Sequence, residues 1–376
     1  MKTRHRFSGA TLGLLFAVMV LHGAGCGMVT TGEPWSTKEL STPVGAANAA
    51  SLHVEFTTRT RSPDTRTSQE HLRDRALQIL RQAADAEYSL LRANAIEAMQ
   101  FAPEHLDPLV RRGLVDDNRG VRFVAAMTIG EYRMDSLAHL LEPLLHDESE
   151  SVHAAAIYAL KRCAKTVDLT PLSSMIVSDD PEVRANAAVV LGDLGNSTAV
   201  PVIRQALGRG MERVNAAKVK MVDLQLAEAL VKLGEVRQIE AIRAALFAPA
   251  EEAELTALAC MMCARLRDER AVPNLIRLAR LTGQFQQPAE VRMAATWALA
   301  HINPAGTTTE VPMEYVTSTQ YQLRVQAALT LGEIGDSASL GVLTTMLADG
   351  NPLVQVAAAS AVLQVLNPAA SRRNRL

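Results

Sequence analysis

Apolar and small residues recur along the chain in one pattern of about ten positions. In its clearest copy Val183, Ala187 and Leu191 stand four residues apart, which places them on one face of a helix. A second small residue, Ala188, follows the middle position, and small residues allow close helix packing. Most copies begin 30 to 32 residues after the preceding one, and the steps of 42 and 36 contain insertions. The pattern predicts nine helices, whose copies begin at residues 91, 121, 152, 183, 225, 255, 291, 323 and 354.

A second helical segment follows the motif in several copies. Pro stands early in this segment, as in Val200-Pro201, where the amide that Pro lacks is largely unpaired. Gly192 closes the preceding run, and we interpret it as a helix stop. Each unit is then a helical hairpin that buries its apolar face only by stacking on its neighbours. The sequence therefore predicts an all-α solenoid over residues 67–366.

These motifs resemble HEAT repeats of the short bacterial type first associated with phycobilin lyases. The resemblance rests on residues 183–195 with Val200-Pro201 and on the copies at 121 and 323. It implies a right-handed α–α superhelix of about nine hairpins that binds other proteins. It also implies a structural ladder in which an Asp pairs with an Arg in the second motif position. Asp116 with Arg122 fits this spacing, whereas Asp147 and Asp349 precede His153 and Gln355 in place of Arg. The other ladder arginines are Arg184, Arg292 and Arg324.

The amino-acid composition disfavours sheet-rich folds and general binding of nucleic acid. Only 4% of the residues are aromatic, which disfavours sheet-rich folds. The formal net charge is -2, so nothing indicates general attraction to nucleic acid.

The sequence of the N-terminal segment predicts that the protein is exported. Basic residues, a 12-residue apolar run over 10–21 and small residues precede Cys26. This resembles a bacterial lipoprotein signal, with Gly23 where Leu is usual. We expect a signal peptide over 1–25, a lipidated Cys26 with a flexible tether to 66, and a basic tail over 367–376. The expected location is the cell envelope, lipid-anchored on the periplasmic face of either membrane; the alternative is a soluble secreted or periplasmic protein.

The search for chemistry finds no catalytic set. Cys260 and Cys263 form a CxxC, but both occupy core positions of a repeat helix, and no second pair completes a zinc site. Deoxyhypusine hydroxylases, which share these repeats, hold iron with His-Glu dyads, and no His-Glu dipeptide occurs here. We predict no cofactor, no metal and no enzymatic activity.

Two surface features are candidates for binding a protein partner. The seventh motif position carries a largely apolar stripe that includes Trp297, Tyr158 and Met127. The stripe either packs against neighbouring helices or forms a groove with Trp297 and Tyr158 as anchors.

The second feature is an insertion over residues 208–222. It is either a solvated helix extension or a docking site for an acidic partner. Its basic residues are Arg209, Arg213, Lys218 and Lys220.

These observations favour a non-enzymatic, membrane-tethered scaffold that binds proteins as yet unknown. The alternative is a lyase- or chaperone-like protein that acts on a protein-bound cofactor, resembling the phycobilin lyases. The export signal argues against that alternative, because those lyases act in the cytoplasm.

Overall fold

The computed structural model describes residues 65–369, and every regular element in that range is a helix. Helices pair as outer–inner hairpins, and the predicted all-α solenoid is confirmed. The outer helices are α2 (Thr65–Ala84), α4 (Leu106–Gly113), the 3₁₀ helix η4 (Asp135–His146), α7 (Pro171–Met175), α9 (Val200–Ala206), α11 (Ile239–Ala245), α13 (Val272–Arg280), α15 (Glu310–Met313) and α17 (Leu340–Met346). The inner helices, which carry the motif, are α3 (Ser89–Ala98), α5 (Arg119–Tyr132), α6 (Glu150–Arg162), α8 (Pro181–Leu194), α10 (Ala216–Lys232), α12 (Ala253–Arg265), α14 (Ala289–Ile302), α16 (Tyr321–Ile334) and α18 (Pro352–Leu366).

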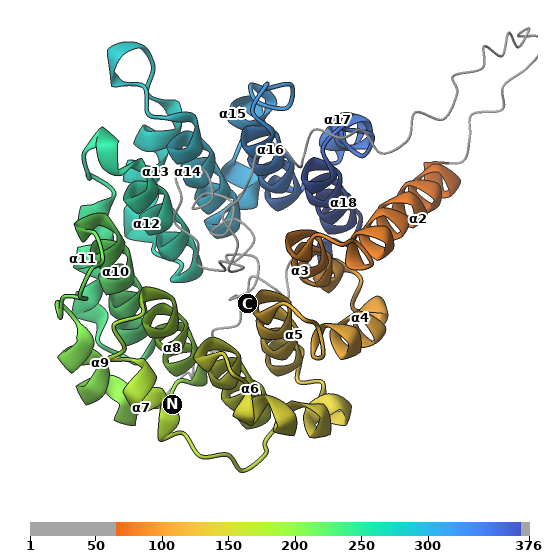
Figure 1. Cartoon of the computed structure of the whole chain (residues 1–376). Coiled ribbons are helices and arrows are strands. Elements are labelled where there is room, and N and C mark those ends of the chain that lie inside the picture. Colours follow the sequence, from red (N-terminus) through yellow and green to blue (C-terminus); the bar gives the residue numbers. More distant parts are fainter. Residues whose placement is uncertain (1–64, 370–376) are drawn as a thin grey trace, which may run out of the picture.

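The nine hairpins form a closed ring (Figure 1). Each inner helix packs on the next, and the last one, α18, packs on both α2 and α3 of the first hairpin. Asn367 Nδ2 also donates to the Phe101 carbonyl oxygen at 3.1 Å, across the junction between the two ends. The superhelix implied by the resemblance therefore closes within one turn, so that neither terminal hairpin leaves its apolar face open to solvent.

Local chemistry fixes where the inner helices begin and end. Asp180 accepts from the backbone amides of Glu182 and Val183 and thereby caps α8, and Asn351 caps α18 in the same manner. Helix α8 ends at Gly195, whose φ of 68° is the left-handed conformation that suits glycine. The inner helices are buried on nearly all sides; in α12 every residue from Leu255 to Ala264 is buried.

The motif glycines have a different role from the predicted one. Gly192, Gly130 and Gly332 lie inside their helices, and each faces the next inner helix. A Cβ added at Gly332 would lie 2.8 Å from the Ala361 Cα. The interpretation of Gly192 as a helix stop is therefore wrong: the helix continues to Leu194, and the glycine permits close helix approach.

These contacts also change the predicted start of one motif copy. Gly332 meets Ala361, the eighth residue of its copy, and Gly192 meets Ala229 in the same way. The α10 copy therefore begins at Val222, three residues before the predicted start at Gln225. The seventh motif position in this copy is then Glu228, not Val231.

Candidate interaction surface

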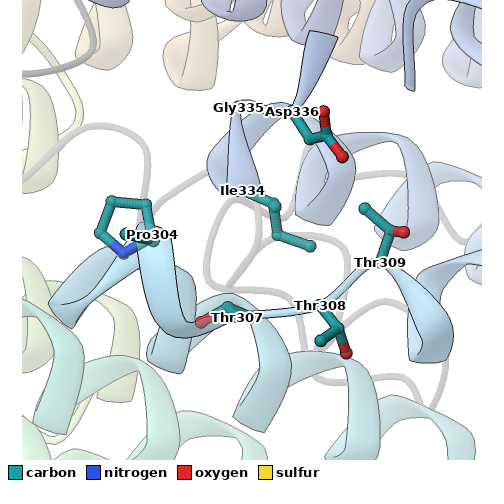
Figure 2. A pocket seen from close by; sticks show the side chains of 8 residues that line it. Pro304, Thr307, Thr308, Thr309, Ile334, Gly335 and Asp336 are labelled. Carbon is teal, nitrogen blue, oxygen red and sulfur yellow. The ribbon is translucent and has the colours of Figure 1, made fainter. Parts of the chain in front are cut away.

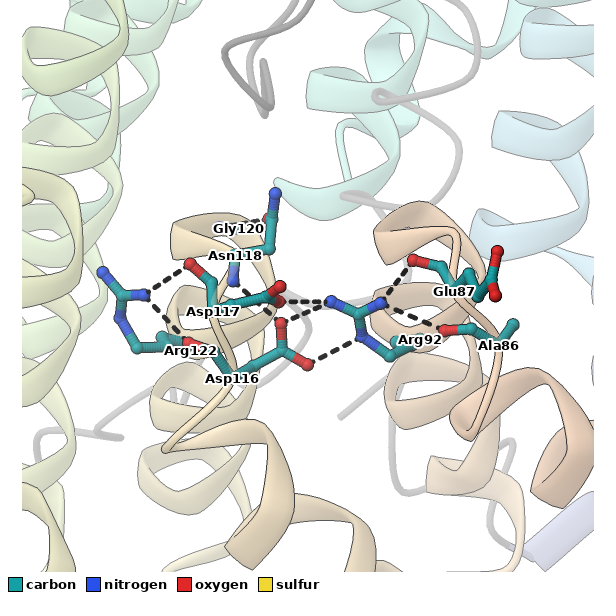
Figure 3. A network of polar contacts seen from close by, with 8 residues as sticks. All are labelled: Ala86, Glu87, Arg92, Asp116, Asp117, Asn118, Gly120 and Arg122. Atoms are coloured by element: carbon teal, nitrogen blue, oxygen red, sulfur yellow. Dashed lines mark hydrogen bonds and ion pairs between the residues drawn. The ribbon is translucent and has the colours of Figure 1, made fainter. Parts of the chain in front are cut away.

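The ladder is present, but it links successive repeats in a different register (Figure 3). Arg92 donates through Nε and Nη2 to both Asp116 carboxylate oxygens, at 2.7 and 2.6 Å. The predicted pair of Asp116 with Arg122 is wrong, because Arg122 reaches only the Asp116 backbone carbonyl, at 2.9 Å. The carboxylate partner of Arg122 is Asp147, 25 residues further along. Each arginine thus ties its own helix to the loop that starts the next inner helix.

The later ladder arginines follow the same rule. Arg324 donates to both Asp349 oxygens at 2.7 and 2.8 Å, so Asp349 does not lack an arginine as the sequence suggested. Burial alone would raise the pKa of Asp349, but Arg324 and the hydrogen bond from the Asn351 backbone amide together outweigh it and hold that pKa below its ordinary value. Arg292 donates to both carboxylate oxygens of Glu314, which takes the place of the aspartate, and also to the Tyr315 hydroxyl.

The ladder is interrupted at Arg184. Its side chain is fully buried and donates to the carbonyl oxygens of Ser178 and Arg209, both at 2.7 Å. Arg209 stands 25 residues after Arg184, where the ladder would place an aspartate. The closest carboxylate, on Asp179, lies 3.6 Å away. The interruption therefore coincides with the start of the basic insertion.

The structure divides the four basic residues of the insertion into two groups. Arg209 and Arg213 are exposed in the loop between α9 and α10, and neither forms an ion pair within residues 65–369. Lys218 and Lys220 lie in α10 itself, which begins at Ala216. Lys220 is bound to Glu252 at 2.5 Å, whereas no ion pair to Lys218 occurs in the described range. Of these four residues, Arg209 and Arg213 are thus the most available to a partner.

The apolar stripe is buried. Trp297, Tyr158 and Met127 are 1%, 3% and 5% exposed. The Tyr158 ring packs on Gly130 of the preceding inner helix, and Trp297 stacks on His301 with ring centroids 5.1 Å apart. These contacts favour packing between neighbouring helices over an exposed groove.

A buried chain of four charges joins α8, α10 and α12. Lys232 bridges Asp193 and Glu228 at 2.8 and 3.3 Å, and Arg265 donates to both Glu228 oxygens. Burial favours the neutral form of Glu228, but the two cations outweigh it and hold its pKa at about 2. The alternating charges compensate one another, so the cluster is part of the ring wall, and removal of one member would leave a buried charge unpaired.

The cysteine pair lies in the core, where the repeat register places it. Cys260 and Cys263 are fully buried in α12. Burial raises the pKa of both thiols, that of Cys263 to about 12. Both therefore stay protonated and act as small apolar side chains.

A hollow of about 480 Å³ lies between the segment 304–309 and the end of α16 (Figure 2). Its ionisable residue, Asp336, already accepts from the Ala338 backbone amide. Thr307 and Thr309 supply hydroxyls, and the other walls include Pro304 and Ile334. This lining holds neither a nucleophile–base pair nor a set of metal ligands.

Three of the exposed apolar residues that the sequence reasoning missed lie close together in the chain. Phe247, Ile276 and Phe285 are 58%, 41% and 63% exposed, on or beside α11 and α13. Arg277 lies over the Phe247 ring, with its Cζ 4.9 Å from the ring centroid. The signal was available, since both phenylalanines stand between predicted helices, but single apolar loop residues are common.

Two further features of the described residues concern metal ligands and membrane-spanning helices. Between 65 and 369 there is no cluster of three or more His, Cys, Asp or Glu that could hold a metal ion. No helix in this part of the chain combines the length and the apolar character needed to cross a bilayer. Cys26, the signal, the tether and most of the basic tail lie outside the described range.

Comparisons with known proteins agree with this architecture. A family described as HEAT repeats matches residues 74–161, and one described as PBS lyase HEAT-like repeat matches 183–209. The chain therefore contains HEAT-like repeats. No curated protein matches it.

Several solved structures match this chain at low TM-scores. The complex of CpcE and CpcF of phycocyanin lyase from Nostoc sp. is 20% identical over 63% of this chain and 79% of that one, with a TM-score of 0.31. Human deoxyhypusine hydroxylase is 14% identical over 80% and 98%, with a TM-score of 0.35. An engineered protein is 18% identical over 81% and 93%, with a TM-score of 0.20.

Proposed function

We propose that the protein is an exported, lipid-anchored scaffold that binds an acidic segment of a partner protein at the bacterial cell envelope. The observation that carries the proposal is the insertion beside α10. There the ladder is interrupted and two exposed arginines, Arg209 and Arg213, have no carboxylate partner among the described residues.

The charges in the loops that precede the inner helices support this site. In the other loops of this kind the ladder arginines pair with carboxylates of the protein itself, as Arg122 does with Asp147. Free guanidinium groups bind carboxylates with two parallel hydrogen bonds, so Arg209 and Arg213 are suited to bind an acidic segment of a partner. A ring closed by its own terminal hairpins is a stiff support for such a site.

The anchoring half of the proposal rests on the sequence around Cys26. Membrane fractionation of cells that express the full chain tests it, with Cys26→Ser as the comparison. We expect wild type in the membrane fraction and the variant in the soluble periplasmic fraction. Recovery of the wild-type protein in the soluble fraction would show that the protein is not lipid-anchored.

The binding half is tested by crosslinking in the same cells. The variant Arg209→Glu/Arg213→Glu should lose the crosslinked partner that wild type retains. The matched control is Arg75→Glu/Arg81→Glu, which reverses two exposed charges on α2 and should retain it. Equal partner recovery by all three proteins would exclude the insertion as the binding site.

A further inference from the structure

The three loops that lead into α5, α12 and α14 lie on one rim of the ring. Every inner helix follows an outer helix and runs in the same direction, so all inner helices begin on the same side. We call this side the leading rim. The loop 114–118 precedes α5, the loop 246–252 precedes α12, and the loop 281–288 precedes α14.

One sector of the leading rim is apolar and cationic. Phe247 and Phe285 stand in the segments of this rim before α12 and α14, and Ile276, Arg277 and Arg280 lie on α13, which leads into the second segment. We call these five residues the aromatic patch. The three apolar side chains are each more than 40% exposed. Arg277 and Arg280 are exposed and form no ion pair within the described residues. Exposed apolar groups beside unpaired guanidinium groups are typical of protein interfaces.

The complementary sector is the loop 114–118. Val115 is 82% exposed, more than any other large apolar side chain in the described range. The Asp117 side chain beside it is 90% exposed, although one oxygen contacts Arg92 at 2.7 Å. The next loop of this rim adds Glu148, whose side chain is 89% exposed. The loop thus offers an apolar residue next to carboxylates, which matches the aromatic patch in both respects.

The two sectors lie on opposite sides of the ring, with α4 and α5 across from α11 to α13 (Figure 1). This placement permits a twofold arrangement of two rings with their leading rims together. A twofold axis in the plane between the rings brings the loop 114–118 of each copy onto the aromatic patch of the other. The twofold axis makes the two contacts identical, so the assembly stops at two copies.

We propose that two copies of the chain pair through their leading rims, with Val115 and Asp117 of each copy docked on the aromatic patch of the other. Val115 lies against the Phe247 and Phe285 rings, and the Asp117 carboxylate pairs with Arg277 or Arg280. The pairing uses neither Cys26 nor Arg209, although the loop before α10 that carries Arg209 lies on the same rim. The crosslink between introduced cysteines and the loss of a partner from Arg209→Glu/Arg213→Glu are therefore separate readouts.

Cysteine crosslinking of two differently tagged full-length copies tests the pairing. One copy carries Val115→Cys and the other Phe247→Cys, and a short bismaleimide reagent is added to the cells. Of the four native cysteines, Cys163, Cys260 and Cys263 are buried and do not compete. Copies without the introduced cysteines control for Cys26. We expect a crosslinked species that contains both tags.

The matched control replaces the second copy by Val236→Cys. Val236 is 65% exposed but lies in a loop that follows an inner helix, on the opposite rim. This pair should give about tenfold less of the doubly tagged species. Arg277→Glu in the Phe247→Cys copy should lower the yield similarly, and Asp117→Arg in the other copy should restore it.

Three results would overturn the pairing. These are absence of the doubly tagged species, an equal yield from the Val236→Cys control, or crosslinking of either introduced thiol to a different protein instead. All substituted sites are exposed, so a melting temperature close to that of wild type checks that each variant folds.

Discussion

Arg122 binds the side chain of Asp147 and only the backbone of Asp116. Its Nε and Nη2 donate to the two Asp147 oxygens at 2.7 and 2.9 Å, while Nη1 donates to the Asp116 carbonyl oxygen. One side chain thus joins the loop before its own helix to the loop before the next. This makes the ladder a connection between repeats, so its loss should weaken stacking more than it weakens any single hairpin.

A double-mutant cycle tests the ladder register. Arg122→Ala and Asp147→Ala should each destabilise the protein and couple by about 1–3 kcal/mol, because a two-point charged hydrogen bond is lost. Arg122→Ala and Asp116→Ala should show almost no coupling, since the carbonyl remains in Asp116→Ala. Denaturant unfolding measures both cycles. Stronger coupling to Asp116 than to Asp147 would restore the register that the sequence suggested.

Gly332→Ala tests the close approach of α16 and α18. The new methyl group would lie 2.8 Å from the Ala361 Cα, so we expect a loss of about 1–3 kcal/mol in the free energy of unfolding. Gly341→Ala in α17 is the control, because no heavy atom lies within 4 Å of its added Cβ. It should be neutral or stabilising by up to about 1 kcal/mol, as expected for alanine in an open helical position. If Gly332→Ala costs no more stability than Gly341→Ala, α16 and α18 are not in close contact at this position.

Glu228→Gln tests the buried charge chain. Removing one charge leaves Arg265 and Lys232 under-compensated in the ring wall, and we expect a loss of about 3–5 kcal/mol at neutral pH. The matched control is Glu142→Gln, which neutralises an exposed carboxylate and should change stability by less than about 0.5 kcal/mol.

The acid dependence of stability follows from the same residue. The pKa of Glu228 is about 2 in the folded protein, against an ordinary value of 4.5. Its contribution is therefore complete above pH 4.5 and is lost as the pH falls from 4.5 toward 2. Urea unfolding over this range should show a steeper loss for wild type than for Glu228→Gln. Parallel profiles would mean that Glu228 is not held by cations in the folded state.

Thiol reactivity tests the burial of the CxxC. Cys260 and Cys263 should not react with an aromatic disulfide reagent at pH 8 in the folded protein, because burial excludes the reagent and raises the pKa of both thiols. Both should react once denaturant unfolds the chain. Rapid reaction of either thiol in the native protein would place it at the surface.

The repeating motif was sufficient to predict most inner helices. Copies with the full pattern, such as the one that became α8, were found because their apolar and small residues recur at fixed spacing. The α10 copy was misplaced by three residues, since the insertion before it removes the regular step and Glu228 occupies the seventh position, which is apolar in most other copies.

Other features depend on geometry that spacing does not encode. Ring closure is the sum of small rotations between nine hairpins, and no single copy reveals it. Asp116 lies six residues before Arg122, yet the stacking of repeats directs its carboxylate to Arg92. Phe247 and Phe285 stand outside the motif, so only their exposure in the folded ring marks them as a surface patch.

The distance between the two ends of the solenoid tests the closed ring most directly. Spin labels at Glu104→Cys and Ala369→Cys occupy exposed sites close to the contact between Phe101 and Asn367. Closure predicts a narrow distance distribution below about 25 Å by pulsed electron resonance, since few residues separate each label from that contact. An open row of nine inner helices, each about 8–10 Å from the next, would separate the labels by more than about 40 Å. A distribution centred at such distances would contradict the closed ring.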